Sequence, residues 1–196
     1  MTGQNDRKRG KGRPRSSRST EAILEATRSL LLESGYSRLS MESVAARSGT
    51  GKATIYRWWP SKGELVLDSA REEISIGVVP DLGNLRDDLA VAIEQLVVTF
   101  TRPLASIVIF AAIAVGDDDP GMAKIFREEF VYPWRVSAAD AIRRGIERGE
   151  LAADTDMHFV LDVIVGTVFQ RTLVVSPPVT EKLVEKLLAL VLPDKE

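Results

Sequence analysis

The sequence predicts an all-α fold, in which a small N-terminal group of short helices is followed by a larger helical C-terminal domain. Apolar residues recur every three to four positions from Thr20 onward, which is the period of a helix. Breaks rich in Gly and Pro divide the chain into segments of helix length. The Val-rich stretch 163–168 shows no polar–apolar alternation and has helix-length flanks, so it does not indicate a strand.

The composition excludes several classes of protein and site. The 196 residues are 44% hydrophobic, which suffices for a buried core, and they include no cysteine and one histidine. Disulfides, thiolate metal sites and most histidine-based acid–base schemes are therefore excluded. The most apolar run, Ile107–Val115, is far shorter than the roughly 20 residues of a membrane-spanning helix. We expect a cytoplasmic protein without a membrane segment, metal or cofactor, and we expect His158 to be a surface or capping residue.

Charge is divided unevenly along the chain. Residues 1–72 carry 14 Lys and Arg against 8 Asp and Glu, whereas residues 73–196 carry 12 against 20. The segment from Arg7 to Arg18 holds seven basic residues and no acidic one. A basic front indicates contact with a polyanion at that end of the chain. Residues 1–18 also lack large apolar side chains, so we expect a disordered basic arm.

Start and stop signals predict the N-terminal helices. A first helix runs from Thr20 to Gly35, which is a C-cap candidate. Ser40 is the expected N-cap of a helix over Met41–Ser48, and Gly49 can adopt the positive φ of a turn. Thr50 is the expected cap of a third helix over 51–58, and Ser61 that of a fourth helix to about residue 76. A break at 80–83 then separates a domain of residues 19–80 from one of residues 81–196.

Longer helices are predicted after the break. Residues 104–115 are apolar on nearly all sides, which predicts a fully buried helix. Asp119 and Pro120 suit the cap and first position of the helix that follows. Pro133 predicts a kink at Tyr132–Pro133 inside that helix. The expected helices cover residues 85–100, 104–115, 122–148, 156–175 and 180–192.

Residues 40–58 have the pattern of a helix-turn-helix, in which an exposed second helix enters the major groove of DNA. In the first helix Val44 and Ala45 should face inward, and Ala45 is small where the helices approach. Ile55 is the only large aliphatic residue of the second helix and should face the core. The outer face is then formed by side chains whose chemistry suits base edges and phosphates, namely Lys52, Ala53, Thr54, Tyr56 and Arg57.

The stretch from Leu39 to Leu65, which contains SVAARSGTGKATIYRWWPSK, resembles the DNA-binding domain of the TetR family. In that family a Val-Ala pair, a turn glycine, a Thr-hydrophobic-Tyr triplet and a downstream Pro-Ser-Lys recur with this spacing. The resemblance covers residues 20–66 and implies a DNA-binding regulator. The implied DNA-contacting set here is Ser40, Thr50, Lys52, Ala53, Thr54, Tyr56, Arg57, Trp58 and Lys62.

The resemblance also assigns roles within this set. Tyr56 and Lys62 would contact phosphates, and Thr54 would make another contact typical of the family. Sequence preference would rest on Lys52, Ala53 and Arg57. The alternative is a three-helix cluster whose aromatic residues only form a core, and this alternative is the preferred interpretation for Trp59.

A second DNA-binding feature lies in the basic arm. The sequence from Lys11 to Arg15, KGRPR, resembles the Gly-Arg-Pro core of an AT-hook. An arginine in an extended segment can enter a narrow minor groove, where the negative potential is high. We therefore expect Arg13 and Arg15 to enter the minor groove beside the recognition helix, with general attraction to phosphate as the alternative.

The TetR resemblance implies that the last two helices form a four-helix bundle with a second copy, giving a homodimer that suits a palindromic operator. The helix over 156–175 is apolar on more than one side, which requires an additional packing surface. The alternative is that this surface packs only within one chain. The expected interface residues are Val160, Val163, Ile164, Val168, Leu183, Leu187 and Leu188.

Members of the TetR family often bind a small molecule in the C-terminal domain, which shifts the spacing of the two recognition helices. The resemblance therefore implies a repressor that such an effector releases from its operator. Aromatic residues on three predicted helices could line the effector pocket, although aromatic residues at helical spacing also form ordinary cores. The candidates are Phe100, Phe110, Phe126, Phe130 and Trp134.

Two other function classes compete with a ligand-responsive regulator. An enzyme lacks support, because the sequence has no phosphate-binding Gly loop, no Ser-His or Cys-His pair and no metal-ligand cluster. The run Asp117–Asp119 precedes a Pro-Gly turn, so helix capping accounts for it. A ligand-independent architectural DNA-binding protein is favoured by the basic arm and disfavoured by the large, aromatic-bearing C-terminal domain.

Overall fold

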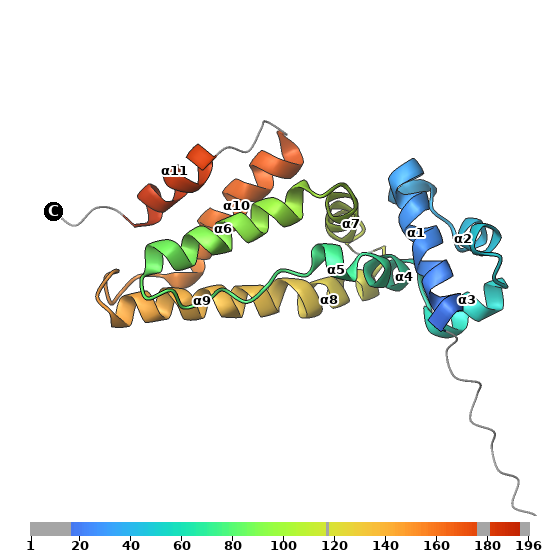
Figure 1. Cartoon of the computed structure of the whole chain (residues 1–196), viewed down its shortest axis with the longest axis horizontal. Helices are drawn as coiled ribbons and strands as arrows, with labels where there is room; N and C mark the ends of the chain where they lie inside the picture. Colours follow the sequence, from blue (N-terminus) through green and yellow to red (C-terminus); the bar gives the residue numbers. More distant parts are fainter. Residues whose placement is uncertain (1–16, 117, 176–180, 193–196) are drawn as a thin grey trace, which may run out of the picture.

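The computed structural model describes residues 17–116, 118–175 and 181–192, and all regular structure within them is helical. The expected all-α fold is confirmed. Four helices form one end of an elongated molecule, and the other helices extend from it (Figure 1). These four are α1 (Ser17–Arg38), α2 (Met41–Ser48), α3 (Lys52–Trp58) and α4 (Lys62–Ser69). The basic arm expected over residues 1–18 lies almost entirely outside the described residues.

Local signals determine the ends of α2. The Ser43 amide donates to Ser40 Oγ at 3.1 Å and the Ser40 amide donates to Ser43 Oγ at 3.1 Å, forming a capping box. Gly49 ends the helix with φ 64°, a left-handed conformation that a side chain would strain. The predicted start, end and turn of this helix are confirmed.

Thr50 is not the cap of α3, contrary to the sequence-based expectation. The helix begins at Lys52, so the capping position falls on Gly51, which has extended backbone and provides no side-chain cap. The Thr50 hydroxyl instead faces the Ser48 carbonyl oxygen at 3.5 Å. Thr50 lies one residue too early in the sequence to reach the amides of the first turn.

The fourth helix is shorter than predicted. Ser61 caps α4 as expected, because the Glu64 amide donates to Ser61 Oγ at 3.1 Å. The helical backbone breaks at Ala70, with φ −107° and ψ 8°, and a single turn, α5 (Arg71–Ile74), follows. Gly35 interrupts α1 in a similar way, with φ 76° and ψ 174°, before a last turn that ends at Arg38.

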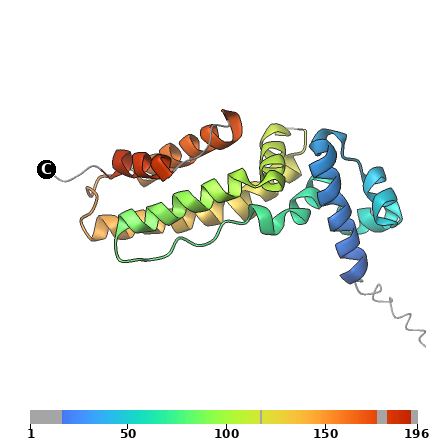
Figure 2. The ribbon, with the colours of Figure 1, turned by 45° about the horizontal axis from the view of Figure 1, so that its top comes forward.

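The C-terminal helices form layers around α6 (Leu85–Thr101). Figures 1 and 2 show α6 between a lower helix and an upper pair, and α6 contacts all three of these helices. The lower layer is the run α8 (Pro120–Phe126), η1 (Arg127–Val131) and α9 (Tyr132–Glu147), and the upper layer is α10 (Met157–Phe169), η2 (Gln170–Val174) and α11 (Glu181–Val191).

The helix α7 (Pro103–Ala114) turns through 89° from α6 and packs against α1 at the junction of the two domains. The sequence predicts that this helix is fully buried, and that prediction is wrong. Phe110 and Ile113 are each 52% exposed, although α7 contacts α1, α5, α6 and α8.

The irregularity predicted at Pro133 takes the form of a π-helical turn. The Tyr132 amide donates to the carbonyl oxygen of Arg127, five residues earlier, instead of four. A proline ring inside an α-helix clashes with the carbonyl four residues before it, and the wider turn relieves this clash. The chain therefore continues from α8 into α9 as one helical run, with the residues of η1 displaced relative to an α-helix.

One buried carboxylate holds the connection between the domains. Asp88 is fully buried, and its Oδ1 accepts from the Leu82 amide at 2.7 Å while Oδ2 accepts from Arg144 at 3.2 Å. Arg144 also donates to the Pro80 carbonyl oxygen at 3.0 Å. The linker between α5 and α6 is thereby fixed against α6 and α9.

Candidate nucleic-acid interface and internal cavity

The helix α3 is exposed on almost every side. Of its seven residues, only Ile55 is buried, and Thr54 is half-buried. Ile55 packs into the core beside Val44 of α2, as its spacing predicts. The exposed residues of α3 are Lys52, Ala53, Tyr56, Arg57 and Trp58. A short helix anchored by one side chain, with its outer face free, has the geometry of a helix that enters the major groove.

Charges on α3 are partly engaged within the chain. The Lys52 ammonium forms an ion pair with Glu42 of α2 and lies 5.6 Å from the centre of the Tyr56 ring. The hydrogen bond between them lowers the pKa of the Glu42 carboxyl and raises the pKa of Lys52. The Arg57 guanidinium lies 5.2 Å from the centre of the Trp58 ring. The surface is therefore basic, with one of its cations masked by a carboxylate.

Lys62, expected to contact a phosphate, is half-buried at the start of α4 and contacts Tyr36. Its Nζ donates to the Tyr36 carbonyl oxygen at 3.2 Å and lies 3.9 Å from the centre of the Tyr36 ring. Burial lowers the pKa of Lys62, although the nearby Asp119 carboxylate acts in the opposite direction. Lys62 thus joins α4 to the end of α1 and does not lie on the exposed face of α3.

Four further residues that the sequence analysis singled out have different outcomes. Ser40 is half-buried and engaged in capping α2. Trp59 is buried and its indole N–H donates to Asp68 Oδ2 at 2.9 Å, which confirms its expected core position. Arg13 and Arg15 lie outside the described residues, so their expected place in the minor groove remains a sequence-based prediction.

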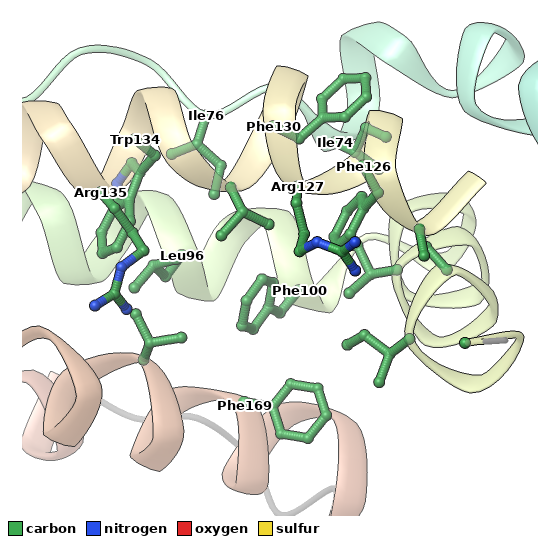
Figure 3. A pocket seen from close by; sticks show the side chains of 17 residues that line it. Ile74, Ile76, Leu96, Phe100, Phe126, Arg127, Phe130, Trp134, Arg135 and Phe169 are labelled. Atoms are coloured by element: carbon green, nitrogen blue, oxygen red, sulfur yellow. The ribbon is translucent and has the colours of Figure 1, made fainter. Parts of the chain in front are cut away.

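A cavity of about 390 Å³ lies in the C-terminal domain, between α6, α7, the α8–η1–α9 run and α10 (Figure 3). Four of the five predicted aromatic residues line it, namely Phe100, Phe126, Phe130 and Trp134. Phe110 does not, because it projects from the outer side of α7 into a surface groove beside Tyr36. The predicted convergence of three helices on one cavity is otherwise present in the geometry.

Sequence reasoning missed several cavity residues. Phe169 packs edge-to-face against Phe100, with ring centres 6.4 Å apart, and Ile74 and Ile76 reach the cavity from the inter-domain connection. Phe169 belongs to a helix that the sequence assigned to the dimer interface, and Ile74 and Ile76 fall at the end of the predicted fourth helix, in the DNA-binding domain. Arg127, the first residue of the π-helical turn, also lines the cavity.

Comparison with known proteins gives matches over both halves of the chain. Residues 23–68 match the bacterial regulatory proteins of the tetR family, and residues 79–191 match the tetracyclin repressor-like C-terminal domain. The chain is 33% identical over 178 residues to an uncharacterized HTH-type transcriptional regulator of Bacillus subtilis, YdeS, covering 90% of this chain and 89% of that protein. The chain belongs to the TetR family.

Two further similarities agree with this assignment. A DNA-binding transcriptional repressor TetR of Mycobacteroides abscessus is 31% identical over 80% of this chain and 83% of its own length. The crystal structure of the TetR family transcription regulator SCO0332 matches with a TM-score of 0.64 and 30% identity, covering 89% of this chain and 96% of that one. This TetR-family chain is a helix-turn-helix transcriptional regulator, and its family is not a class of enzymes.

In this TetR-family chain, several of the expected interface residues are already buried within the monomer. Ile164 and Val168 of α10, and Leu187 and Leu188 of α11, belong to the core of their own chain, where they have little surface left for a partner. Val160, Val163 and Leu183 are half-buried. The apolar side chains that α10, the end of η2 and α11 expose are Phe159, Val174, Val175 and Leu190.

The same region also qualifies the expectation that no segment could span a membrane. The helical run Met157–Val174 has the length and composition of a span, with a mean hydropathy of 1.3, and only 17% of it is buried in the chain. One run of this kind is a weak indication of a membrane segment, because core and interface helices of soluble proteins share its composition.

Proposed function

We propose that this chain is a cytoplasmic, homodimeric repressor that binds a palindromic operator and is released from it by a small molecule bound in the cavity. The observation that carries the DNA-binding part is the exposure of α3, which buries Ile55 and presents donors on the rest of its surface. The repressor mode is supported by the similarity to the Mycobacteroides abscessus repressor.

Within this proposal the exposed residues of α3 have separate roles. Tyr56 and Thr54 contact the backbone and fix the position of the helix on DNA. Lys52, Ala53 and Arg57 face base edges, where Lys and Arg donate to guanine. Arg13 and Arg15 reach the adjacent minor groove from the arm. Lys62, at the start of α4, stays in the proposed set as a phosphate contact, because its hydrogen bond to the Tyr36 carbonyl oxygen uses one of three N–H donors.

Dimerisation is supported by the apolar surface of α10 and α11. Phe159 and Leu190 are 65% and 66% exposed, which is unfavourable for large apolar side chains in water. Both helices form the outer layer at the same side of the domain in Figures 1 and 2. A second copy that packs on this layer would cover these side chains in a four-helix arrangement and would align two α3 helices for a two-fold symmetric operator.

The test is a selection of random duplex DNA by the full-length protein at near-physiological salt, followed by sequencing of the retained DNA. The proposal expects an enriched palindrome whose half-sites are about one helical turn, or a multiple of it, apart. Enrichment of A·T-rich DNA without symmetry would instead support an architectural protein that binds mainly through its arm. Retention without any sequence enrichment would contradict sequence-specific repression.

Substitutions on α3 separate the proposed roles. Tyr56→Phe should weaken binding to every sequence in proportion, because it removes a phosphate contact. Lys52→Gln and Arg57→Gln should change which base is preferred at one position of each half-site, a discrimination worth about 1–3 kcal/mol for a good contact. Equal losses on all sequences for the last two variants would contradict their assignment to base edges.

A further inference from the structure

The described residues that line the cavity provide no negative charge. Its walls are formed by aliphatic and aromatic side chains, and its charged members are Arg127 and Arg135. Phe126 and Phe130 form a stacked pair, with ring centres 6.1 Å apart, along one wall. Such a lining favours an apolar ligand body and gives a cationic ligand no counter-charge.

The two arginines differ in their partners. Arg135 Nη1 donates to Asp162 Oδ1 at 2.8 Å, so its charge is balanced within the chain. Arg127 has no hydrogen bond or ion pair with any residue in the described part of the chain. Figure 3 shows its guanidinium among the cavity residues, with Phe100 and Phe126 close to it in the view.

The carboxylates beside Arg127 in the sequence are directed elsewhere. Glu129 Oε2 accepts from Arg71 at 2.7 Å, and Glu128 lies 3.9 Å from the Lys124 ammonium. An exposed guanidinium at the edge of an apolar cavity, with nearby carboxylates already engaged, is a ready partner for an anion.

A second polar group in the cavity lining also lacks a partner. Trp134 is 4% exposed, and its indole N–H has no acceptor among the described residues. Buried donors normally have a hydrogen-bond acceptor. A buried indole N–H that lacks one inside a binding cavity therefore indicates that a bound ligand supplies the acceptor. Both unpartnered groups in the lining are donors, and a carboxylate is the ligand group that offers acceptors and a negative charge together.

We infer that the effector of this regulator is a hydrophobic carboxylic acid, whose apolar body fills the cavity and whose carboxylate pairs with Arg127. This inference rests on the proposed function, because it identifies the chemical class of the proposed effector. An aliphatic and an aromatic acid share the required chemistry. The experiment therefore includes both.

The test measures binding to the full-length protein without DNA, by displacement of the fluorescent aromatic anion 1-anilinonaphthalene-8-sulfonate. The competitors are dodecanoic acid and its methyl ester, and 2-naphthoic acid and its methyl ester. For at least one pair, the acid should displace the probe at about tenfold lower concentration than the ester, as expected for a charge-assisted pair. An ester that competes as well as its acid in both pairs would overturn the inference.

Variants then locate the effect. Arg127→Gln should abolish the preference for the acid while binding of the matching ester stays unchanged, which also shows that the cavity is intact. Lys124→Gln is the matched control, because it removes a neighbouring positive charge that does not line the cavity, and it should keep the preference. An unchanged preference in Arg127→Gln, or an equal loss in Lys124→Gln, would overturn the assignment to Arg127.

The outcome of the acid-binding experiment can be distinguished from the outcome of the DNA selection that tests the proposed function. A palindrome enriched in the DNA selection, without any preference for acids, would refute the ligand class and leave the repressor intact. Acids that bind through Arg127 would support the site even if the selection finds no palindrome. The same acids added to an operator complex should release the DNA, and retention of the complex at saturating acid would contradict their role as effectors.

Discussion

The Lys52–Glu42 pair keeps a DNA-facing cation masked in the DNA-free protein. Lys52 lowers the pKa of Glu42, so the carboxylate is ionised at neutral pH and the pair is lost only as the pH falls through that lowered pKa. The Glu42 carboxylate therefore competes with DNA for the Lys52 ammonium and repels nearby phosphates. Glu42→Gln should therefore tighten operator binding by about two- to fivefold, the range expected for an exposed ion pair.

The measurement is an operator titration at several salt concentrations, with Glu33→Gln as the matched control. Glu33 is another exposed carboxylate, and its pKa is lowered by Arg47 instead of by a residue of α3. Both variants remove one negative charge, so a general electrostatic effect would be equal in the two. A gain confined to Glu42→Gln supports the masking role, and equal gains contradict it.

At this scale the sequence predicts which residues share a helix face but not what lies opposite them. Ile55 and Trp59 were assigned correctly, because apolar or aromatic character and spacing determine their burial. Phe110 was not, because it emerges from α7 into a surface groove beside Tyr36 instead of lining the cavity. The hydrogen bond from Lys62 to a carbonyl oxygen 26 positions earlier in the chain was not predicted either. Both features depend on contacts between distant segments.

At the scale of elements, the turn between α2 and α3 depends on one backbone conformation. Gly49 has φ 64° and open space around its Cα, so a side chain there is strained by the backbone alone and meets no neighbour. Gly49→Ala should lower the free energy of unfolding by about 1 kcal/mol. Chemical denaturation followed by circular dichroism measures this loss.

Gly51→Ser is the control for that measurement. Gly51 also has open space around it, but its φ of −62° suits any residue, and it occupies the N-cap of α3 without a side-chain cap. Serine at this position should be stabilising by a few tenths of a kcal/mol. If Gly49→Ala were as well tolerated as Gly51→Ser, the positive φ of the turn would carry no energetic cost.

Helix ends that rest on local chemistry were predictable, whereas irregularities inside helices were not. Ser40, Gly49, Ser61 and Asp119 all act at the expected caps, since each needs only its neighbours in the sequence. The break at Ala70 has no sequence signal. Pro133 indicated a disturbance in the correct place, but its form as a π-helical turn depends on packing against other helices.

At the scale of the whole molecule, the sequence could not separate a core from an interface. The stripe through Ile164, Val168, Leu187 and Leu188 is equally compatible with burial inside one chain and burial between two, and the structure places these residues inside. The proposed interface therefore rests on other side chains. Phe159→Glu should weaken the dimer by about tenfold or more, because it places a charge in an apolar contact.

Sedimentation at micromolar protein measures this effect, with Tyr132→Glu as the matched control. Tyr132 is 51% exposed on α9, in the lower layer, so its substitution adds the same charge and removes an exposed aromatic ring outside the layer of α10, η2 and α11. The first variant should sediment as a monomer and lose operator affinity, while the second stays dimeric. A dimeric Phe159→Glu protein would contradict this interface.

The cavity and the DNA-binding domain meet where α4 packs against α8. A Cβ added at Gly63 would lie 2.5 Å from Met122 Cβ and would overlap Asp119, so no other residue fits without moving the two helices apart. Met122 precedes Ala123 and Phe126, which line the cavity on the same helix. A ligand that displaces α8 would therefore displace α4 and, with it, the recognition helix of the same chain.

Gly63→Ala tests this connection, because it should shift α4 relative to α8 even without a ligand. We expect weaker operator binding, by about tenfold, together with unchanged displacement of the fluorescent probe from the cavity. The control is Gly121→Ala on the same helix, where the nearest atom to the new Cβ, Asp119 Oδ1, is 3.4 Å away. If both variants bind the operator as the unmodified protein does, the α4–α8 contact does not set the position of the recognition helix.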